Sequence, residues 1–204
     1  MCAIDEQGVR SSLQPTRESD LTLRLLDSET QEAERVLSAI AGDVAARSWI
    51  VDHYTPPIHR YCLRMLRQPE LAQETTQEVM YRALSKLQRF DPQRSFKTWI
   101  FSIARNACID LHRKRRPTQS TDDTVLKDRN DLPDAALDRK TRAQRLNNAV
   151  SELPDLYREV ILLYHFEHLK YQEIAEALEI PLGTVMNRIF RARQKLRDRL
   201  GGVE

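Results

Sequence analysis

The sequence is poor in the residues that build β-sheets. Glycine occurs only 5 times in 204 residues, and aromatic residues make up 6% of the chain. β-branched residues do not alternate with polar residues over any long stretch. This composition favours helices throughout the chain.

Cysteine and long apolar runs are scarce as well. The three cysteines, Cys2, Cys62 and Cys108, form no CxxC pair and no Cys/His cluster, so we predict neither a disulfide framework nor a metal site. No apolar run approaches the length of a membrane span, and the first residues do not resemble a signal peptide. We therefore expect a reduced, cytoplasmic protein without membrane insertion.

Net charge is small, but the charges are unevenly distributed. The net charge is only +2, yet residues 94–117 carry seven Lys and Arg against one acid, and residues 182–200 carry six against one. Residues 18–34 and 122–138 are rich in acids instead. Either the two basic segments are binding surfaces for a polyanion, or they are solvated helix faces.

Helical periodicity and its interruptions indicate an all-α fold, with two small helical domains joined by a flexible linker. We expect a tail over residues 1–33, a first domain over 34–117, the linker over 118–140 and a second domain over 141–204. The linker is rich in Thr, Ser, Asp, Asn and Pro and lacks a sustained apolar period.

Local signals place the helices of the first domain. Asp43 is a predicted N-cap, and Pro56 with Pro57 is expected to stop or bend the helix that follows. Residues 70–90 form a predicted amphipathic helix, and another helix runs to Pro117.

The helix that ends at Pro117 carries two patterns. Phe96, Trp99 and Ile103 recur at helical spacing as a core-facing stripe. In projection, a polar stripe falls away from these residues and consists of Thr98, Ser102 and Arg105, with Asn106 and Arg113 beside it. A polar face that ends in a basic run is suited to a nucleic-acid strand.

The last two helices have the spacing of a helix-turn-helix. The first spans Tyr171–Leu178, residues 179–182 form the turn, and the second helix follows. Projection of the second helix puts its apolar residues on one face: Val185, Ile189, Ala192, Leu196 and Leu200. Asn187, Arg191 and Gln194 point the other way, and their amide and guanidinium groups suit base edges in a major groove.

The chain as a whole resembles a bacterial RNA polymerase sigma factor of the extracytoplasmic-function group. The resemblance is carried by "YQEIAEALEIPLGTVMNRIFRARQKLRDRL" and "FDPQRSFKTWIFSIARNACIDLHRKRRP", and by "GDVAARSWIVDHY" and "AQETTQEVMYRAL" in the same order as in the family. It covers residues 34–200. Thr75, Thr76 and Met80 depart from the apolar or Phe residues that are usual at their positions.

The resemblance implies a role for each surface. The coiled coil of the largest-subunit clamp of core polymerase would bind a face made of Glu74, Gln77, Glu78, Tyr81 and Arg82, and the polymerase flap would be a further contact. The −10 promoter element would be read and melted by Phe96, Thr98, Ser102, Arg105, Asn106, Arg113, Lys114, Arg115 and Arg116. The −35 element would be read by Thr184, Asn187, Arg188, Phe190 and Arg191, with Arg193 and Lys195 on phosphates.

The resemblance also implies an anti-sigma partner, either soluble or membrane-bound, that would hold the factor inactive or tether it to the membrane. The sequence carries no nucleotide-binding loop and no nucleophile–base pair, so we predict a non-enzyme that needs no cofactor. Two alternatives are a dimeric helix-turn-helix regulator and a DNA-processing enzyme such as a recombinase. The first domain disfavours the regulator, and the lack of clustered acids or a nucleophile beside arginines disfavours the enzyme.

Overall fold

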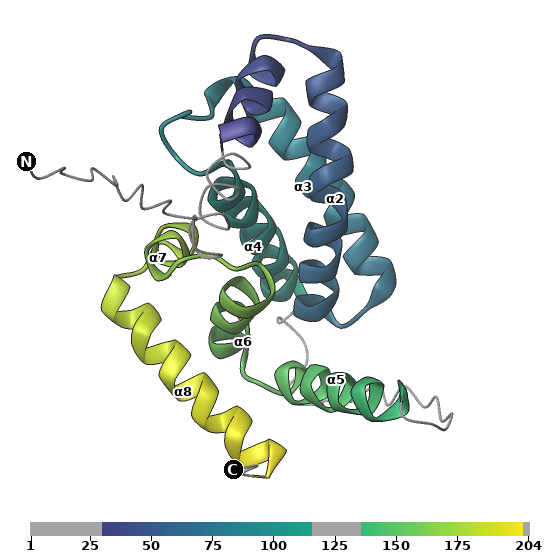
Figure 1. The fold of residues 1–204 in the computed structure, drawn as a ribbon, viewed down its shortest axis with the longest axis vertical. Coiled ribbons are helices and arrows are strands. Elements are labelled where there is room, and N and C mark those ends of the chain that lie inside the picture. Colours follow the sequence, from purple (N-terminus) through teal and green to yellow (C-terminus); the bar gives the residue numbers. More distant parts are fainter. Residues whose placement is uncertain (1–29, 116–135, 202–204) are drawn as a thin grey trace, which may run out of the picture.

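A computed structural model describes residues 30–115 and 136–201, and every regular element in these two ranges is a helix. The tail over 1–29 and most of the predicted linker lie outside the described residues. Figure 1 shows the helices in two groups, which we call the N-terminal unit (residues 30–115) and the C-terminal unit (136–201).

The N-terminal unit is a bundle around one apolar core. A helix over residues 30–40 precedes α2 (Val44–Leu66) and α3 (Pro69–Lys86), which a short 3₁₀ turn (Leu87–Arg89) extends, and α4 (Phe96–Arg115) follows. Every third or fourth residue of these helices is buried, in the pattern that amphipathic helices require. The all-helical prediction is confirmed.

Helix α2 begins where the sequence predicts, but it continues through the two prolines in its middle. The carboxylate of Asp43 accepts a hydrogen bond of 2.9 Å from the amide of Ala45, as a helix N-cap does. Pro56 and Pro57 were predicted to stop or bend the helix, and the first alternative is wrong, because α2 runs through both residues. The carbonyls of Asp52 and His53 lose their partners in the helix, and both residues are exposed, so water can bind them.

The C-terminal unit contains the helix-turn-helix. α5 (Ala136–Ser151) begins inside the predicted linker and leads to α6 (Asp155–Ile161), which continues as a π-helical turn (Leu162–Phe166). α7 (Tyr171–Leu178) and α8 (Leu182–Leu200) then form the helix-turn-helix over the predicted residues. The face of α8 with Val185, Ile189, Ala192 and Leu196 is buried, as its projection indicates, whereas Leu200, projected onto the same face, is exposed at the end of the helix.

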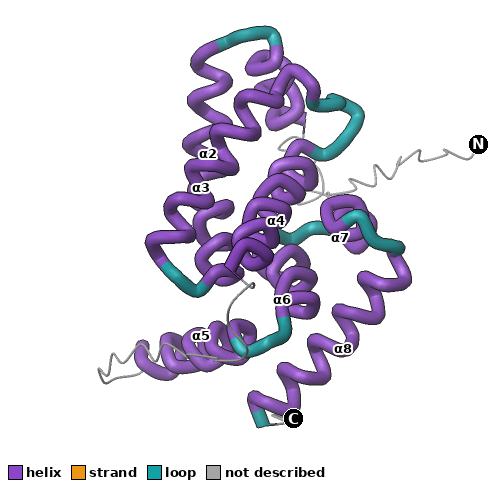
Figure 2. The backbone as a smooth tube through the Cα atoms, turned by 180° about the vertical axis from the view of Figure 1, so that it is seen from behind, coloured by secondary structure: helices purple, strands orange, loops and turns teal. Residues whose placement is uncertain are grey.

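The two units pack against each other. In Figures 1 and 2, α4 lies between α2 and α3 on one side and α6 and α7 on the other. Helices α4 and α7 are in contact, α2 also contacts α6, and the buried apolar residues of both units form one continuous cluster. No helix in the described ranges combines the length and apolarity that a membrane crossing needs.

Candidate nucleic-acid interface

The outward face of α8 presents groups that can read base edges. Asn187 and Arg191 are exposed, and the Nε of Arg191 donates to the Oδ1 of Asn187 over 3.0 Å, which holds the two planar groups side by side. An open groove of about 450 Å³ runs between these residues and the start of α6, with Leu156, Tyr157 and Thr184 in its wall. A guanidinium and an amide on one exposed helix face match guanine and adenine edges.

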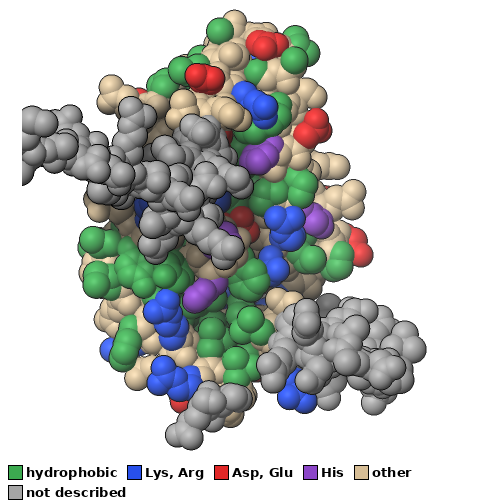
Figure 3. All heavy atoms as spheres, in the orientation of Figure 1, with side chains coloured by type: hydrophobic (Ala, Val, Ile, Leu, Met, Phe, Trp, Pro, Cys, Tyr) green, Lys and Arg blue, Asp and Glu red, His purple; other side chains and the backbone are tan. Residues whose placement is uncertain are grey.

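Apolar side chains share this face. Leu182, Met186 and Phe190 lie four residues apart and are all exposed, Phe190 to 62%. Figure 3 shows apolar side chains beside Lys and Arg along α8. A monomeric protein seldom exposes such a stripe without a partner, so the face suits both a base stack and a protein surface.

The other basic residues of α8 differ in how accessible their charges are to a DNA phosphate. The Nη1 of Arg188 donates to the Oε1 of Glu159 over 2.7 Å, and the arginine is half-buried. The guanidinium of Arg193 lies 5.2 Å from the ring of Tyr164, and the ammonium of Lys195 lies 5.8 Å from the ring of Tyr157. Arg193 and Lys195 are nevertheless exposed, so their charges can face phosphates.

Two residues of the predicted −10 surface are buried. Thr98 is only 1% exposed, so its placement on an outward stripe was wrong. Phe96 is 5% exposed, and its ring packs edge-on against Tyr54 and Phe90 at 5.2 Å, so it supports the loop before α4 and does not present a free stacking face. Trp99 joins the same cluster, as predicted.

The rest of the predicted stripe is more accessible. Asn106, Arg113 and Lys114 are exposed, and Ser102 is half-buried, with its hydroxyl donating to the carbonyl of Trp99 over 2.7 Å. Arg105 is half-buried and donates to Asn106 over 3.1 Å. The side chains of Arg115 and Arg116 lie outside the described residues.

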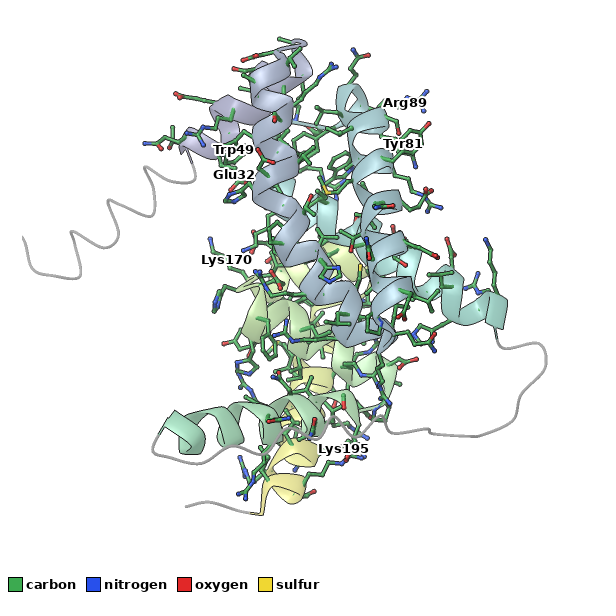
Figure 4. All side chains as sticks on the ribbon, turned by 90° about the vertical axis from the view of Figure 1, so that its right-hand side faces the viewer. Glu32, Trp49, Tyr81, Arg89, Lys170 and Lys195 are labelled. Carbon is green, nitrogen blue, oxygen red and sulfur yellow. The ribbon has the colours of Figure 1, made fainter. Side chains whose placement is uncertain are left out.

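The outer face of α3 is polar and open. Glu74, Gln77 and Glu78 are exposed, and Arg82 pairs with Glu78 over 2.6 Å. Tyr81 is 71% exposed, and Figure 4 shows it at the outer edge of the molecule. Thr75 and Thr76 point inward and are buried, so the residues that depart from the family pattern belong to the packing side of α3.

Two buried charges at the start of α6 were not predicted from the sequence. Arg158 is 3% exposed, and its guanidinium donates to the carbonyls of Ser151, Leu153 and Met65. Glu159 is 4% exposed. Burial raises the pKa of the Glu159 carboxyl, and the guanidinium groups of Arg105 and Arg188 partly oppose this. The sequence signal for this burial was available: in "REVILL", two opposite charges directly precede an apolar run.

Known proteins resemble both units. The family model "Sigma-70 region 2" matches residues 50–118, and "Sigma-70, region 4" matches residues 143–196. The ECF RNA polymerase sigma factor SigW of Bacillus subtilis is 35% identical over 178 residues, which are 82% of this chain and 95% of SigW. The ECF RNA polymerase sigma factor RpoE of Cereibacter sphaeroides is 33% identical over 161 residues, 78% of this chain and 88% of RpoE.

A solved structure shares the fold. CnrH, determined in complex with the cytosolic domain of CnrY, aligns with 85% of this chain and 99% of its own length, at a TM-score of 0.64 and 23% identity.

Proposed function

The chain belongs to the sigma-70 family, in its extracytoplasmic-function group, and from this premise we propose how its surfaces divide the work of promoter-specific initiation. It is an alternative sigma factor, and its action is to direct the polymerase to promoters. The single observation that supports our assignment most is α8, whose exposed Asn187 and Arg191 lie opposite a fully buried face. We assign the N-terminal unit to core binding and −10 melting and the C-terminal unit to the −35 element.

The outer face of α3 is the docking surface for core polymerase. Exposed aromatic residues among polar ones are typical of interface hot spots, and Tyr81 has this setting between Gln77, Glu78 and Arg82. We expect Gln77→Ala with Glu78→Ala to abolish or strongly weaken binding of the full chain to core polymerase. The matched control is Gln172→Ala with Glu179→Ala, which removes the same two groups from an exposed position of α7 and from the exposed residue that follows this helix.

The −35 element is read by Asn187 and Arg191. Thr184 and Phe190 lie beside these two residues, and Arg193 and Lys195 contact phosphates. Arg188 reaches DNA only if it leaves Glu159. The −10 surface consists of Ser102, Arg105, Asn106, Arg113 and Lys114, continued by Arg115 and Arg116. Base extrusion costs a few kcal/mol, which contacts to the displaced strand offset.

An initiation assay tests the proposal. Purified chain and core polymerase are presented with a randomised promoter library, and transcribed sequences are selected. We expect an enriched pair of elements, and Arg191→Ala should weaken binding to the selected −35 duplex by roughly 5- to 100-fold while leaving scrambled DNA little affected. Equal loss on scrambled DNA would make Arg191 a phosphate contact. A chain that regulates promoters without binding core polymerase would instead be a dimeric helix-turn-helix regulator.

An anti-sigma factor is the regulatory partner we propose. The related fold of CnrH was determined with the cytosolic domain of CnrY bound, and the apolar stripe of Leu182, Met186 and Phe190 supplies a surface that a partner can cover. The partner is identified as a protein that blocks initiation in the assay above and loses this effect with Leu182→Lys and Met186→Lys, two exposed positions outside the proposed −35 residues. Inhibition that survives both substitutions would place the partner elsewhere.

A further inference from the structure

Arg188 differs from the other basic residues of α8 because a carboxylate of the same unit holds its charge. Its Nη1 donates to the Oε1 of Glu159 on α6 over 2.7 Å, which is the length of a strong charge-assisted hydrogen bond. Arg188 is half-buried, and the remaining basic residues of α8 are all exposed: Arg191, Arg193, Lys195, Arg197 and Arg199. Arg188 is therefore the basic side chain of this helix that is least accessible to a DNA phosphate.

Glu159 is placed to hold this arginine and does not face solvent. The residue is 4% exposed, and the second oxygen of its carboxylate, Oε2, lies 3.4 Å from the Nε of Arg105 on α4. That distance is beyond the usual range of an N–H···O hydrogen bond, so Arg188 is the closer partner. If Arg188 left, the buried carboxylate would keep only the weaker partner, and this makes release of the arginine unfavourable.

Arg188 lies where a released guanidinium could reach DNA. It lines the open groove of about 450 Å³ together with Thr184, Asn187 and Arg191, which we assign to the −35 element. A guanidinium in this groove that no carboxylate holds can bind a phosphate of any sequence, because phosphate contacts carry no sequence information. Each such contact would strengthen binding to promoter and non-promoter DNA alike.

We propose that Glu159 is a positioning residue that determines specificity through Arg188. Its carboxylate takes the place of a DNA phosphate, so the arginine contributes little to sequence-independent binding, and Asn187 and Arg191 supply a larger share of the affinity. This inference rests on the function proposed above, because it needs α8 to be the DNA-reading helix. Without Glu159, the arginine can select a phosphate on any duplex, whereas base contacts fix the register of α8 on its own element.

The salt dependence of DNA binding by the full-length chain tests this role. Glu159→Gln keeps the shape of the side chain and removes its charge. We expect the variant to bind a scrambled duplex roughly three- to tenfold more tightly than the parent at about 0.1 M salt, and the slope of log K against log salt to steepen by about 0.9, the value for one added phosphate contact. Affinity for the selected −35 duplex should change by less than about twofold, so the specificity ratio falls.

Second substitutions show which arginine is responsible. Arg188→Gln added to Glu159→Gln should return the affinity for scrambled DNA and the salt slope to the parent values. Arg105→Gln added to Glu159→Gln should leave the gain in place, relative to Arg105→Gln alone. Glu152→Gln is the matched control, because Glu152 pairs with Arg199 of α8 at 3.6 Å, but both side chains are exposed. Release of an arginine that already faces solvent should leave the salt slope unchanged.

A comparison in the parent background covers the case in which Glu159→Gln does not fold, which circular dichroism detects. Arg188→Gln should then flatten the salt slope by less than half as much as Arg193→Gln, because Arg193 is exposed and Arg188 is held by Glu159. Equal flattening by the two substitutions would show that Glu159 does not keep Arg188 from DNA.

The outcomes separate this inference from the proposed function. An unchanged salt slope in folded Glu159→Gln, weaker binding to both duplexes, or a gain that disappears with Arg105→Gln would overturn the role of Glu159. Initiation with core polymerase would still support the sigma function in that case. If the chain fails to bind core polymerase but shows a steeper slope that Arg188→Gln reverses, the assigned function fails and the role of Glu159 in DNA binding stands.

Discussion

Removal of the buried guanidinium of Arg158 should unfold the C-terminal unit before the N-terminal one. Its Nη2 donates to the carbonyls of Ser151 and Leu153 over 2.8 and 2.6 Å, and its Nη1 donates to Met65. Arg158→Met has a similar length but no donors, so three carbonyls lose their partner. Because each unpaired buried group costs about 1–3 kcal/mol, and relaxation recovers part of this, we expect a loss of about 3–5 kcal/mol.

Two optical signals distinguish the units in this experiment. Both tryptophans, Trp49 and Trp99, lie in the N-terminal unit, whereas far-UV circular dichroism reports helices of both units. In a urea titration of Arg158→Met, part of the dichroism should disappear at lower urea, and the tryptophan fluorescence should change at a higher concentration. Arg158→Lys should recover only part of the loss, because one ammonium cannot reproduce the planar fork. Arg197→Met, at an exposed position, is the control.

A small effect of Arg158→Met would refute this role of Arg158. If the free energy of unfolding of Arg158→Met lies within about 1 kcal/mol of that of the parent chain or of Arg197→Met, the hydrogen bonds to the three carbonyls do not hold the start of α6. That margin is about the accuracy of an extrapolated free energy of unfolding.

Two further predictions concern buried polar groups. Thr98→Val should change the free energy of unfolding by less than about 1 kcal/mol and leave initiation intact, because the buried hydroxyl of Thr98 has no hydrogen-bond partner among the described residues. If the folded variant fails to initiate, Thr98 contacts DNA and the prediction is wrong. Burial raises the pKa of Glu167, opposed by Lys97, Arg60 and Arg64. Because the folded chain then holds this proton more tightly, its stability contribution is lost as pH rises above the ordinary value of 4.5. Glu167→Gln should gain stability relative to the parent between pH 5 and pH 8 in urea titrations, and a constant difference would refute the shift.

Local signals predicted the elements whose surroundings are simple. Apolar residues of α8 that recur at a spacing of three and four need one buried face, and Val185 and Ile189 occupy it as projected. Asp43 needs only the next two residues to act as a cap. Neither feature depends on residues that are distant in the sequence, so local sequence was enough to predict both.

The errors come from contacts between distant segments. The projection of α4 put Thr98 on an outward stripe, but α2, α3 and α7 all contact this helix, so this polar residue is enclosed. The contact with α7 joins residues about 70 positions apart, for which periodicity carries no information. Helix α2 passes through Pro56 and Pro57 because packing on both sides holds it, which overrides the local preference.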